Sequence, residues 1–243
     1  PNPCIECNRK VRFRALLDRT DELGCDILVT GHHARVENDE GIYRLRKAVD
    51  GTKDQSYVLH MLGQEQLRRL LLPVGELTKG RVRELAHELG LRTASKPDSQ
   101  DVCFSHSDGG RRKFLGDRIP LSPARIVDTE GQELGRTDAV QLVTIGQRKG
   151  LGLAGNDVRH YVTDIDRAGG VVTVGTEDQT VAPATELVDL AWTHEPVTDG
   201  LTIQCSAHGS RLPGRVVDSA VVWDTPHRRV ASGQAVVFYV DDE

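Results

Sequence analysis

Apolar residues in the first third of the chain recur at helical spacing. A helix is predicted over residues 8–23, with Asn8 as its cap and Gly24 as its end. Its apolar positions are Phe13, Leu16, Leu17 and Leu23. The next apolar run, residues 27–30, has the length of a short buried strand and leads into Gly31. A helix, a buried strand and a glycine in succession indicate an α/β layer.

A second helix is predicted after Thr78. Thr78 is a suitable N-cap, and Gly90 is a suitable end. The apolar face consists of Val82, Leu85, Ala86 and Leu89. This helix completes an α/β region that we expect to cover residues 1–118, as the later part of a Rossmann-like, adenine-nucleotide-hydrolase-like domain.

From about Pro120 short apolar runs alternate with turn signals. We expect a central β-rich domain over residues 119–182 and a C-terminal β-barrel domain over residues 183–243. The predicted strands include residues 126–127, 161–165, 171–174, 201–205, 215–217, 221–223 and 235–239. The predicted fold class is therefore α/β followed by two small β-rich domains.

Composition narrows the class of protein. A hydrophobic share of 38% and a charged share of 28% are those of a soluble globular chain, and no apolar run has the length of a membrane helix. We therefore expect a cytoplasmic location. Only 4% of residues are aromatic, which argues against a platform on which many bases stack. The net charge is −5, but basic clusters occur at residues 9–14, 111–113, 148–149 and 228–229.

The cysteines carry the first candidate chemistry. Their number, five, is odd, which favours reduced thiols with individual roles over a disulfide framework. Cys4 and Cys7 form a Cys-x-x-Cys pair that fits a redox dithiol, half of a metal site or two unrelated thiols. Cys7 is expected at a helix N-terminus, where the dipole and nearby cations favour a thiolate. The alternative is a capped surface helix with an incidental cysteine.

The other thiols differ in their setting. Cys103 lies in a polar, turn-rich stretch and is expected on a loop, where a thiol is well placed for chemistry. Cys25 and Cys205 lie in apolar contexts and are expected to fill the core.

Three polar stretches are candidate binding sites. Gly31 at the end of a strand can let a nucleotide approach the backbone, whereas His32 and His33 are typical of a solvated loop. Residues 53–57 fit either a charged helix start or a patch of donors and acceptors for sugar, phosphate or base. Residues 145–152 place Arg148 and Lys149 on a glycine-rich loop that could follow a phosphate backbone. The alternative for this loop is a flexible surface segment.

Taken in order, several short strings resemble the family of tRNA-specific 2-thiouridylases, and the resemblance covers nearly the whole chain. The strings are Pro1-Asn2-Pro3 with Cys7-Asn8, Thr30-Gly31-His32, Lys53-Asp54-Gln55-Ser56-Tyr57, Pro73-Val74-Gly75-Glu76-Leu77, Asp98-Ser99 with Cys103-Phe104, Gly146-Gln147-Arg148-Lys149-Gly150-Leu151-Gly152, and Gly233-Gln234-Ala235-Val236. Each string alone is weak. Their common order is specific.

The resemblance implies an enzyme that uses ATP, with Mg²⁺, to adenylate the C2 oxygen of the wobble uridine of tRNA. A persulfide then delivers sulfur to that carbon. By position, Cys7 resembles the nucleophile and Cys103 the persulfide carrier, and the two can form a disulfide as the sulfur leaves. Release of hydrogen sulfide before attack would use the same residues. The implied partners are tRNA and a cysteine desulfurase or persulfide-carrying protein.

Further roles follow from the same resemblance. Gly31 corresponds to a nucleotide-contacting glycine. Residues that meet the target base or tRNA are Asn2, Pro3, Cys4, Lys53, Asp54, Gln55, Arg148 and Lys149, and positions linked to accepting several tRNAs are His32 and Gln234.

The chain departs from the family pattern in several places. The phosphate-binding Ser-Gly-Gly-x-Asp-Ser loop is not in this sequence, so we expect a fragment that binds ATP poorly and does not turn over alone. The sequence also ends soon after Tyr239, short of the last strand expected for the barrel. Ser206 and Ala207 stand where an Arg-Tyr pair is common, so that tRNA contact is not expected.

Cys4 replaces an acidic residue of the family pattern. With Cys7 and Cys103 it supplies three thiolates, which could hold an iron–sulfur cluster. A different class remains open, an RNA-binding module without catalysis in which Cys4 and Cys7 hold structural zinc or a cluster. A thioredoxin-like oxidoreductase is disfavoured, because no strand precedes the cysteine pair in this sequence.

Overall fold

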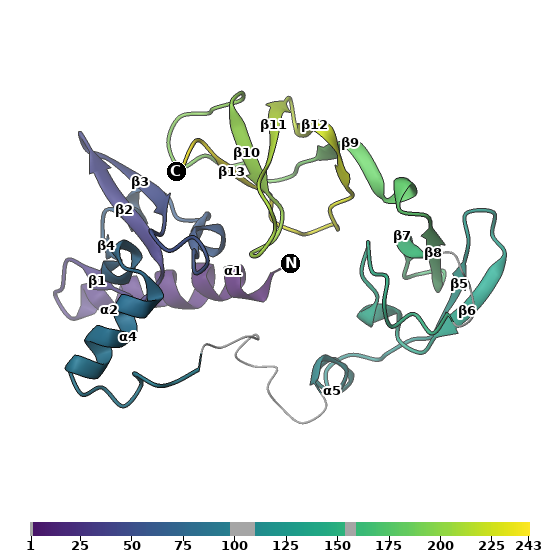
Figure 1. Cartoon of the computed structure of the whole chain (residues 1–243), viewed down its shortest axis with the longest axis horizontal. Coiled ribbons are helices and arrows are strands. Elements are labelled where there is room, and N and C mark those ends of the chain that lie inside the picture. Colours follow the sequence, from purple (N-terminus) through teal and green to yellow (C-terminus); the bar gives the residue numbers. More distant parts are fainter. Residues whose placement is uncertain (1, 98–109, 154–158) are drawn as a thin grey trace. The chain divides into compact units, whose positions relative to one another are not determined.

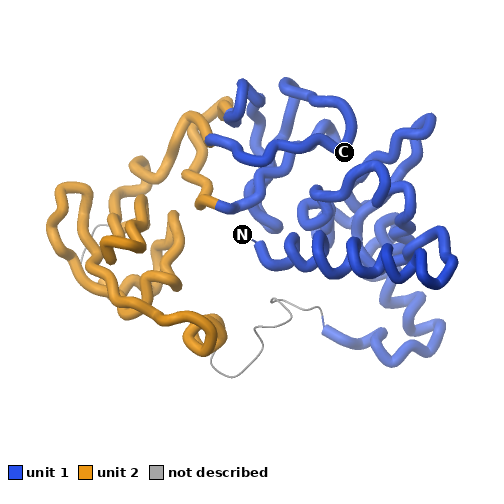
Figure 2. Tube along the Cα trace, turned by 180° about the vertical axis from the view of Figure 1, so that it is seen from behind, with its two compact units in different colours: residues 1–98, 186–221, 233–243 blue, residues 99–185, 222–232 orange. Residues whose placement is uncertain are grey.

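The computed structural model describes residues 2–97, 110–153 and 159–243. Its chain packs as two compact units (Figure 2). Unit 1 comprises residues 1–98, 186–221 and 233–243, and unit 2 comprises residues 99–185 and 222–232. These units follow spatial packing, and the predicted domain boundaries after residues 118 and 182 stay a prediction.

Unit 1 begins with one long helical run (Figure 1). The run consists of α1 (Pro3–Cys7), the π-helical stretch η1 (Asn8–Ala15) and α2 (Leu16–Glu22). Asn2 has extended backbone angles, and its side chain accepts a hydrogen bond from the Cys4 amide, so Asn2 is the N-cap. The prediction of a start at Asn8 was wrong, because Asn2 followed by Pro3 is itself a helix-starting signal. Gly24, at φ +67°, ends the run as predicted.

A small parallel sheet and a hairpin lie beside this helical run. Strand β1 (Leu28–Val29) pairs in parallel with β4 (Leu70–Leu71), and β2 (Ala34–Asp39) pairs antiparallel with β3 (Ile42–Lys47). β1 is less buried than predicted, since 56% of Val29 is exposed. The short helices between and after these strands are η2 (Ser56–Leu59), α3 (Gln64–Leu67) and η3 (Pro73–Glu76).

The predicted helix after Thr78 is α4 (Lys79–Glu88). The Thr78 side chain accepts a hydrogen bond from the Arg81 amide, and Gly90 has a positive φ, so both predicted ends are confirmed. The apolar face is only half-buried, and 73% of Leu89 is exposed. This helix is therefore held less firmly than its pattern predicts.

Among the described residues, two apolar clusters pack around the helical run of unit 1. The first packs the helical run against the short helices and β4, and its buried members are Phe13, Leu17, Ala34, Leu59, Leu62, Leu67, Leu70 and Leu72. The second joins α1 and η2 to the last strand through Ile5, Tyr57, Val237 and Tyr239. The start of the helical run, which carries Cys4 and Cys7, is thus anchored to residues from the end of the chain.

The C-terminal strands form a five-stranded sheet in the order β13-β10-β11-β12-β9. Their bounds are β9 (Val181–Glu186), β10 (Leu201–Gln204), β11 (Leu212–Val217), β12 (Ala220–Arg228) and β13 (Val237–Tyr239). Strand β10 is antiparallel to both β11 and β13. The apolar runs after residue 183 are therefore strands, as predicted.

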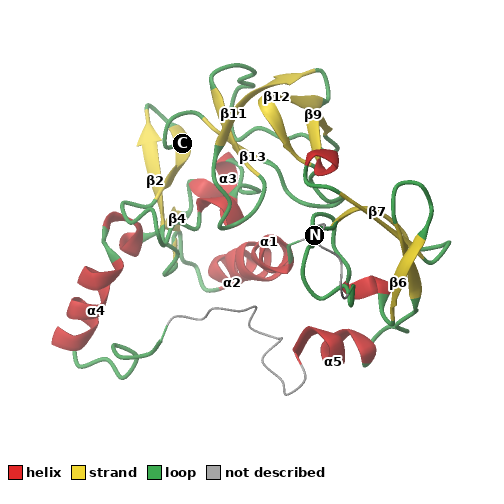
Figure 3. Ribbon diagram, turned by 45° about the vertical axis from the view of Figure 1, so that its right-hand side comes forward, coloured by secondary structure: helices red, strands yellow, loops and turns green. Residues whose placement is uncertain are grey.

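Unit 2 is built around a four-stranded sheet in the order β6-β5-β8-β7. Its strands are β5 (Ala124–Val127), β6 (Glu133–Thr137), β7 (Tyr161–Asp166) and β8 (Val171–Gly175). The short helices are α5 (Gly110–Gly116), η4 (Val140–Leu142) and η5 (Asp178–Thr180), and α5 lies below the sheet near β6 (Figure 3). The core includes Ile126, Val140, Val162 and Val172.

Across the described ranges, no helix combines the length and apolar character needed to cross a membrane.

Candidate active site and RNA-binding surface

Cys4 and Cys7 lie one turn apart at the start of the helical run. Cys4 is in the first turn and exposed, whereas Cys7 is the last residue of α1 and half-buried. Asn8, the predicted cap, is instead buried inside the run, and its side-chain amide donates to the Val58 carbonyl at 3.3 Å. Because the helix dipole acts mainly within the first turn, it favours an anion at Cys4 more than at Cys7. The predicted position of Cys7 at the helix N-terminus was wrong.

The cations near the cysteine pair are engaged by a carboxylate. Glu6 accepts contacts from Arg9 at 3.2 Å and from Lys10 at 3.0 Å. The hydrogen bond from Lys10 lowers the pKa of the Glu6 carboxyl. Arg9 and Lys10 therefore form ion pairs with Glu6. Their positive charge, which was predicted to favour a Cys7 thiolate, is partly neutralised by this carboxylate.

The second predicted catalytic thiol, Cys103, lies outside the described residues. Within the described ranges, no group of three or more His, Cys, Asp or Glu side chains could hold a metal ion. Two of the three thiols predicted for an iron–sulfur cluster, Cys4 and Cys7, are on one helix turn. The cluster and the Cys7–Cys103 pairing stay predictions.

The two thiols predicted to fill the core are placed differently. Cys25 follows the helix-ending Gly24 and is exposed, so that prediction was wrong: the chain turns outward there before β1 begins. Cys205 is half-buried after β10, and burial raises the pKa of its thiol to about 11. At neutral pH Cys205 is a neutral thiol.

Gly31 lies just beyond the carboxyl end of β1. The parallel ladder continues to Thr30, whose amide donates to the Leu71 carbonyl at 3.1 Å. Gly31 itself is exposed, and a Cβ added there would meet no atom within 4 Å. Ligands of α/β sheets bind outside the carboxyl ends of parallel strands, so this open backbone is in the right place for one.

His32 and His33 are both buried, which contradicts the predicted solvated loop. His32 Nδ1 lies 2.9 Å from the Thr30 hydroxyl, and the His32 ring packs against Phe13 with centroids 5.5 Å apart. Burial, then the charges of Arg12 and His33, lower the pKa of His32 to about 4. His32 is therefore a neutral, wedged side chain.

Asp54 is a structural hub. Its Oδ1 accepts from the amides of Ala48 and Ser56, at 3.0 and 3.2 Å. Its Oδ2 accepts from the Ser56 hydroxyl at 2.7 Å and from Arg211 at 3.0 Å. The Asp54 side chain is only 10% exposed, so these four contacts leave little of the carboxylate for a ligand.

Gln55 is engaged with the buried histidine segment. The His33 amide donates to the Gln55 side-chain oxygen at 2.8 Å, and the Gln55 amide donates to the His33 carbonyl at 2.7 Å. Lys53, one position before Asp54, is half-exposed. Of the three residues predicted to contact tRNA here, Lys53 is the one with a positively charged side chain.

Gln234 and Tyr57 are in contact, although they lie far apart in the sequence. The Gln234 side-chain amide donates to the Tyr57 hydroxyl at 2.8 Å, and that hydroxyl donates to the Ala235 carbonyl at 3.0 Å. Burial raises the pKa of Tyr57. The structure thus brings the predicted position Gln234 beside the 53–57 segment, although 177 residues separate Gln234 from Tyr57.

Sequence reasoning missed Arg211 and Tyr239. The Arg211 guanidinium lies over the Tyr239 ring at 3.7 Å, and the Tyr239 hydroxyl lies 3.1 Å from the Ser56 hydroxyl. Arg211 also donates to Gln204, whose amide donates to the Ser206 carbonyl at 2.8 Å. No local pattern marks Arg211, because its partners come from distant segments.

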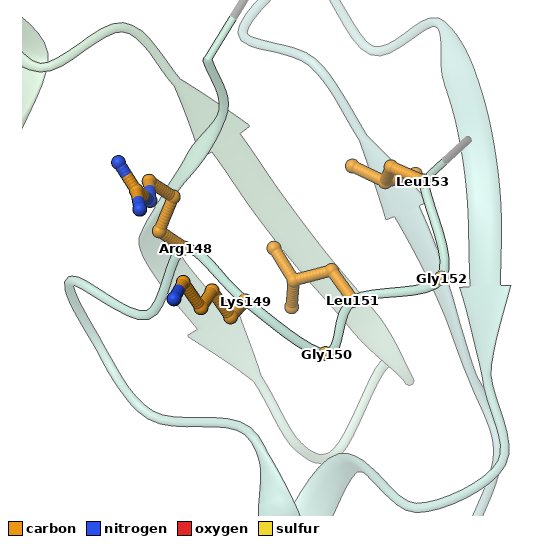
Figure 4. Close-up of a pocket in the computed structure, with 6 residues that line it drawn as sticks. All are labelled: Arg148, Lys149, Gly150, Leu151, Gly152 and Leu153. Carbon is orange, nitrogen blue, oxygen red and sulfur yellow. The ribbon is translucent and has the colours of Figure 1, made fainter. Parts of the chain in front are cut away.

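The glycine-rich loop of unit 2 is a held turn with exposed cations. The Gln147 side chain accepts from the Thr144 amide at 3.0 Å and donates to the Lys149 carbonyl at 2.9 Å. Leu151 is 5% exposed and belongs to the core of the unit. Figure 4 shows Arg148 and Lys149 extending away from Leu151, beside a pocket of about 400 Å³ lined by residues 148–153. These contacts favour a fixed loop over the flexible alternative.

Comparison with known proteins places this geometry in a family. Residues 1–107 match the model of a "tRNA methyl transferase HUP domain", and residues 112–176 match that of a "tRNA methyl transferase PRC-barrel domain". These matches confirm the predicted fold class of a Rossmann-like α/β region followed by β-rich structure.

Curated relatives match almost the whole chain. A protein of Chloroflexus aurantiacus is 45% identical over 98% of this chain and 69% of its own length. Relatives from a Roseiflexus species and from Corynebacterium kroppenstedtii are 43% and 44% identical over 100% of this chain, and over 72% and 66% of their own lengths. All three are named tRNA-specific 2-thiouridylase.

Proposed function

The chain belongs to the family of tRNA-specific 2-thiouridylases, and we propose that it transfers sulfur to C2 of the wobble uridine of tRNA in an ATP-dependent reaction. The enzyme class is that of a tRNA-uridine 2-sulfurtransferase. The observation that carries the proposal is the 45% identity over 98% of the chain. The cysteines on an anchored helix start are consistent with it.

The proposed chemistry has two stages. In the first, the C2 oxygen of uridine attacks ATP and pyrophosphate leaves, so that the oxygen becomes part of a good leaving group. In the second, the terminal sulfur of a Cys103 persulfide attacks C2 and AMP leaves with the oxygen. Cys7 then attacks the inner sulfur, which breaks the persulfide bond and forms a Cys7–Cys103 disulfide. An external thiol reduces this disulfide before the next cycle.

The geometry of α1 supports the role of Cys7. Asn2 fixes the start of the helix, and Ile5 packs on Tyr57 and Tyr239, so the cysteine turn has a defined position. Cys7 is half-buried, so the residue is partly accessible to a partner. Asn2, Pro3 and Cys4 are the exposed or half-exposed residues of the same end, and we propose that they face the target base.

ATP is proposed to bind against Gly31, with Mg²⁺ neutralising its phosphates. The support is the exposed backbone at the carboxyl end of β1, with open space where a side chain would stand. Gly31 contributes close approach of the main chain and no side-chain chemistry.

The contacts to tRNA are divided between direct and indirect ones. Lys53, Arg148 and Lys149 are proposed as direct phosphate contacts, because they are exposed or half-exposed cations. Asp54, Gln55, His32 and Gln234 are proposed to act through the conformation of the 53–57 segment, because each is committed to internal hydrogen bonds. We also propose a cysteine desulfurase or a persulfide-carrying protein as sulfur donor, and the cytoplasm as the location.

An iron–sulfur variant of the mechanism would use Cys4, Cys7 and Cys103 as ligands. Metal and sulfide analysis of protein purified without oxygen separates the variants. Iron with acid-labile sulfide supports the cluster, and metal-free protein with full activity supports the persulfide route. Zinc at one ion per chain would instead support the RNA-binding module without catalysis.

The reaction product tests the proposed function directly. The complete protein is incubated with unmodified tRNA, ATP, a cysteine desulfurase and cysteine, and the nucleosides are analysed by mass spectrometry. We expect 2-thiouridine at the wobble position, dependent on ATP. The descriptions of the family models name a methyl transferase, so the same reaction is run with a methyl donor. A methylated nucleoside without thiouridine would contradict the proposal.

A further inference from the structure

Helix α5 of unit 2 carries three consecutive cations that the proposed function leaves without a role. Arg111, Arg112 and Lys113 are all exposed. Arg118, just after the helix, is also exposed and lies over the Phe114 ring at 3.9 Å. This short stretch is therefore a concentration of positive charge in a chain whose net charge is −5.

Arg111 differs from its neighbours because its guanidinium donates a hydrogen bond to a main-chain carbonyl. Its Nη2 donates to the Leu142 carbonyl at the end of η4. This contact docks α5 onto the segment that leads into the glycine-rich loop. Leu142 is six residues before Arg148, a separation that a fully extended chain could span in about 20 Å. Arg148 therefore lies within about 20 Å of the carbonyl to which Arg111 ties α5.

The cations of the two segments are poorly neutralised. Arg112 lies 3.8 Å from Asp138, but the two side chains are 59% and 88% exposed, so this pair contributes little. Within the part of the chain that the structure describes, no ion pair involves Lys113, Arg148 or Lys149. Exposed cations without carboxylate partners are the arrangement that binds a phosphate backbone.

We propose that α5 and the glycine-rich loop over residues 145–152 form one phosphate-binding track on unit 2, which follows the backbone of the tRNA. Arg112, Lys113, Arg148 and Lys149 contact phosphates, and Arg111 is a positioning residue that fixes α5 beside the loop. The track reads no sequence, because the contacts described are cationic and no aromatic platform accompanies the loop residues. The inference rests on tRNA as the substrate and adds the surface that holds it.

The test measures tRNA affinity of the full chain as a function of salt concentration. Two variants remove two charges each, Arg112→Ala with Lys113→Ala, and Arg148→Ala with Lys149→Ala. The matched control is Arg19→Ala with Arg68→Ala, which removes two exposed cations from unit 1. The net charge of all three variants is the same, so a general field effect is common to them.

We expect each track variant to weaken tRNA binding several-fold and to lower the slope of log Kd against log salt by about one to two. Their combination should lower the slope by the sum, and the control should keep the wild-type slope. An α5 variant that behaves as the control overturns the track while leaving tRNA as the substrate. Absence of tRNA binding by the wild-type chain would instead contradict the proposed function.

Arg111 is tested separately, because it acts through position. Arg111→Ala should lower tRNA affinity and raise hydrogen exchange in α5, whereas Arg111→Lys keeps a charge and an N–H donor and should restore both. If Arg111→Ala raises hydrogen exchange without changing tRNA affinity, the docking of α5 is structural only, and the role of Arg111 as a positioning residue is overturned.

Discussion

At the level of single residues, the burial of His32 should make the stability of the fold depend on pH. Its pKa is lowered to about 4 in the folded chain, whereas an unfolded His has a pKa near 6.5. The unfolded state therefore binds a proton that the folded state does not as the pH falls from about 6.5 to about 4. Unfolding should become easier across that window, by on the order of 3 kcal/mol for this group.

The measurement is the free energy of unfolding against pH for the wild type and for His32→Asn. The difference between the two curves should change between pH values of about 6.5 and 4 and be flat above that range. Taking the difference removes the contributions of the other titrating groups. Parallel curves would contradict the buried, neutral state of His32.

A second residue-scale prediction concerns thiol reactivity. Cys205 is half-buried with a pKa raised to about 11 by burial, whereas Cys25 is exposed. Because the thiolate is the reactive form, Cys205 should be alkylated more slowly than Cys25 at neutral pH. Mass mapping after a short exposure to iodoacetamide measures the order. Faster labelling of Cys205 than of Cys25 would show that the β10 end opens in solution.

At the level of elements, substitution of two glycines should change the free energy of unfolding very differently. A Cβ on Gly75 would lie 1.8 Å from the Ala34 carbonyl oxygen, which fixes the close approach of η3 to β2. Gly75→Ala should therefore destabilise the fold by about 3 kcal/mol, the upper range for overpacking. Gly31→Ala adds a Cβ into open space and should leave the free energy of unfolding nearly unchanged.

The same pair separates folding from ATP use. In the complete protein Gly31→Ala should raise the KM for ATP several-fold, because a methyl group would stand where the nucleotide approaches. Thermal denaturation and ATP-dependent turnover are measured on both variants. A Gly31→Ala enzyme with a wild-type KM would remove Gly31 from the proposed nucleotide site, and it would leave the packing role of Gly75 untouched.

The ion pair between Asp54 of the 53–57 segment and Arg211 is tested by a double-mutant cycle. Asp54 and Arg211 are 10% and 20% exposed and 3.0 Å apart. We expect a coupling of about 1 kcal/mol or more between Asp54→Asn and Arg211→Gln, measured by chemical denaturation. A coupling near zero would mean that water replaces the pair at no cost. The 53–57 segment would then be held to the C-terminal residues by the Tyr57 contacts instead.

Elements were predictable from the sequence where the signal is local. Thr78 and Gly90 were predicted as the ends of α4, because capping depends on a few neighbouring residues. The helix start was misplaced because Asn8 and Asn2 are both plausible caps. Burial decides between them, since Asn8 contacts Val58, fifty residues away.

At the scale of the whole molecule, the site could be predicted only in part. The order of motifs identified the family, and the family models confirm the fold class. The commitment of Asp54 to Arg211, and of Tyr57 to Gln234, depends on segments 157 and 177 residues apart, for which the sequence holds no local signal. The motifs alone do not separate the exposed cations from the residues that make internal hydrogen bonds. That distinction depends on how the chain packs.

In the proposed mechanism, Cys7 and Cys103 together carry sulfur to the wobble uridine. The most direct measurement is 2-thiouridine formation by the complete protein in Cys7→Ser, Cys103→Ser and, as the control, Cys25→Ser, with tRNA affinity measured on each. We expect thiolation to be lost in the first two variants and retained in the third, with tRNA binding unchanged in all. Retained thiolation in Cys103→Ser would contradict the proposed role of Cys103 as the persulfide carrier.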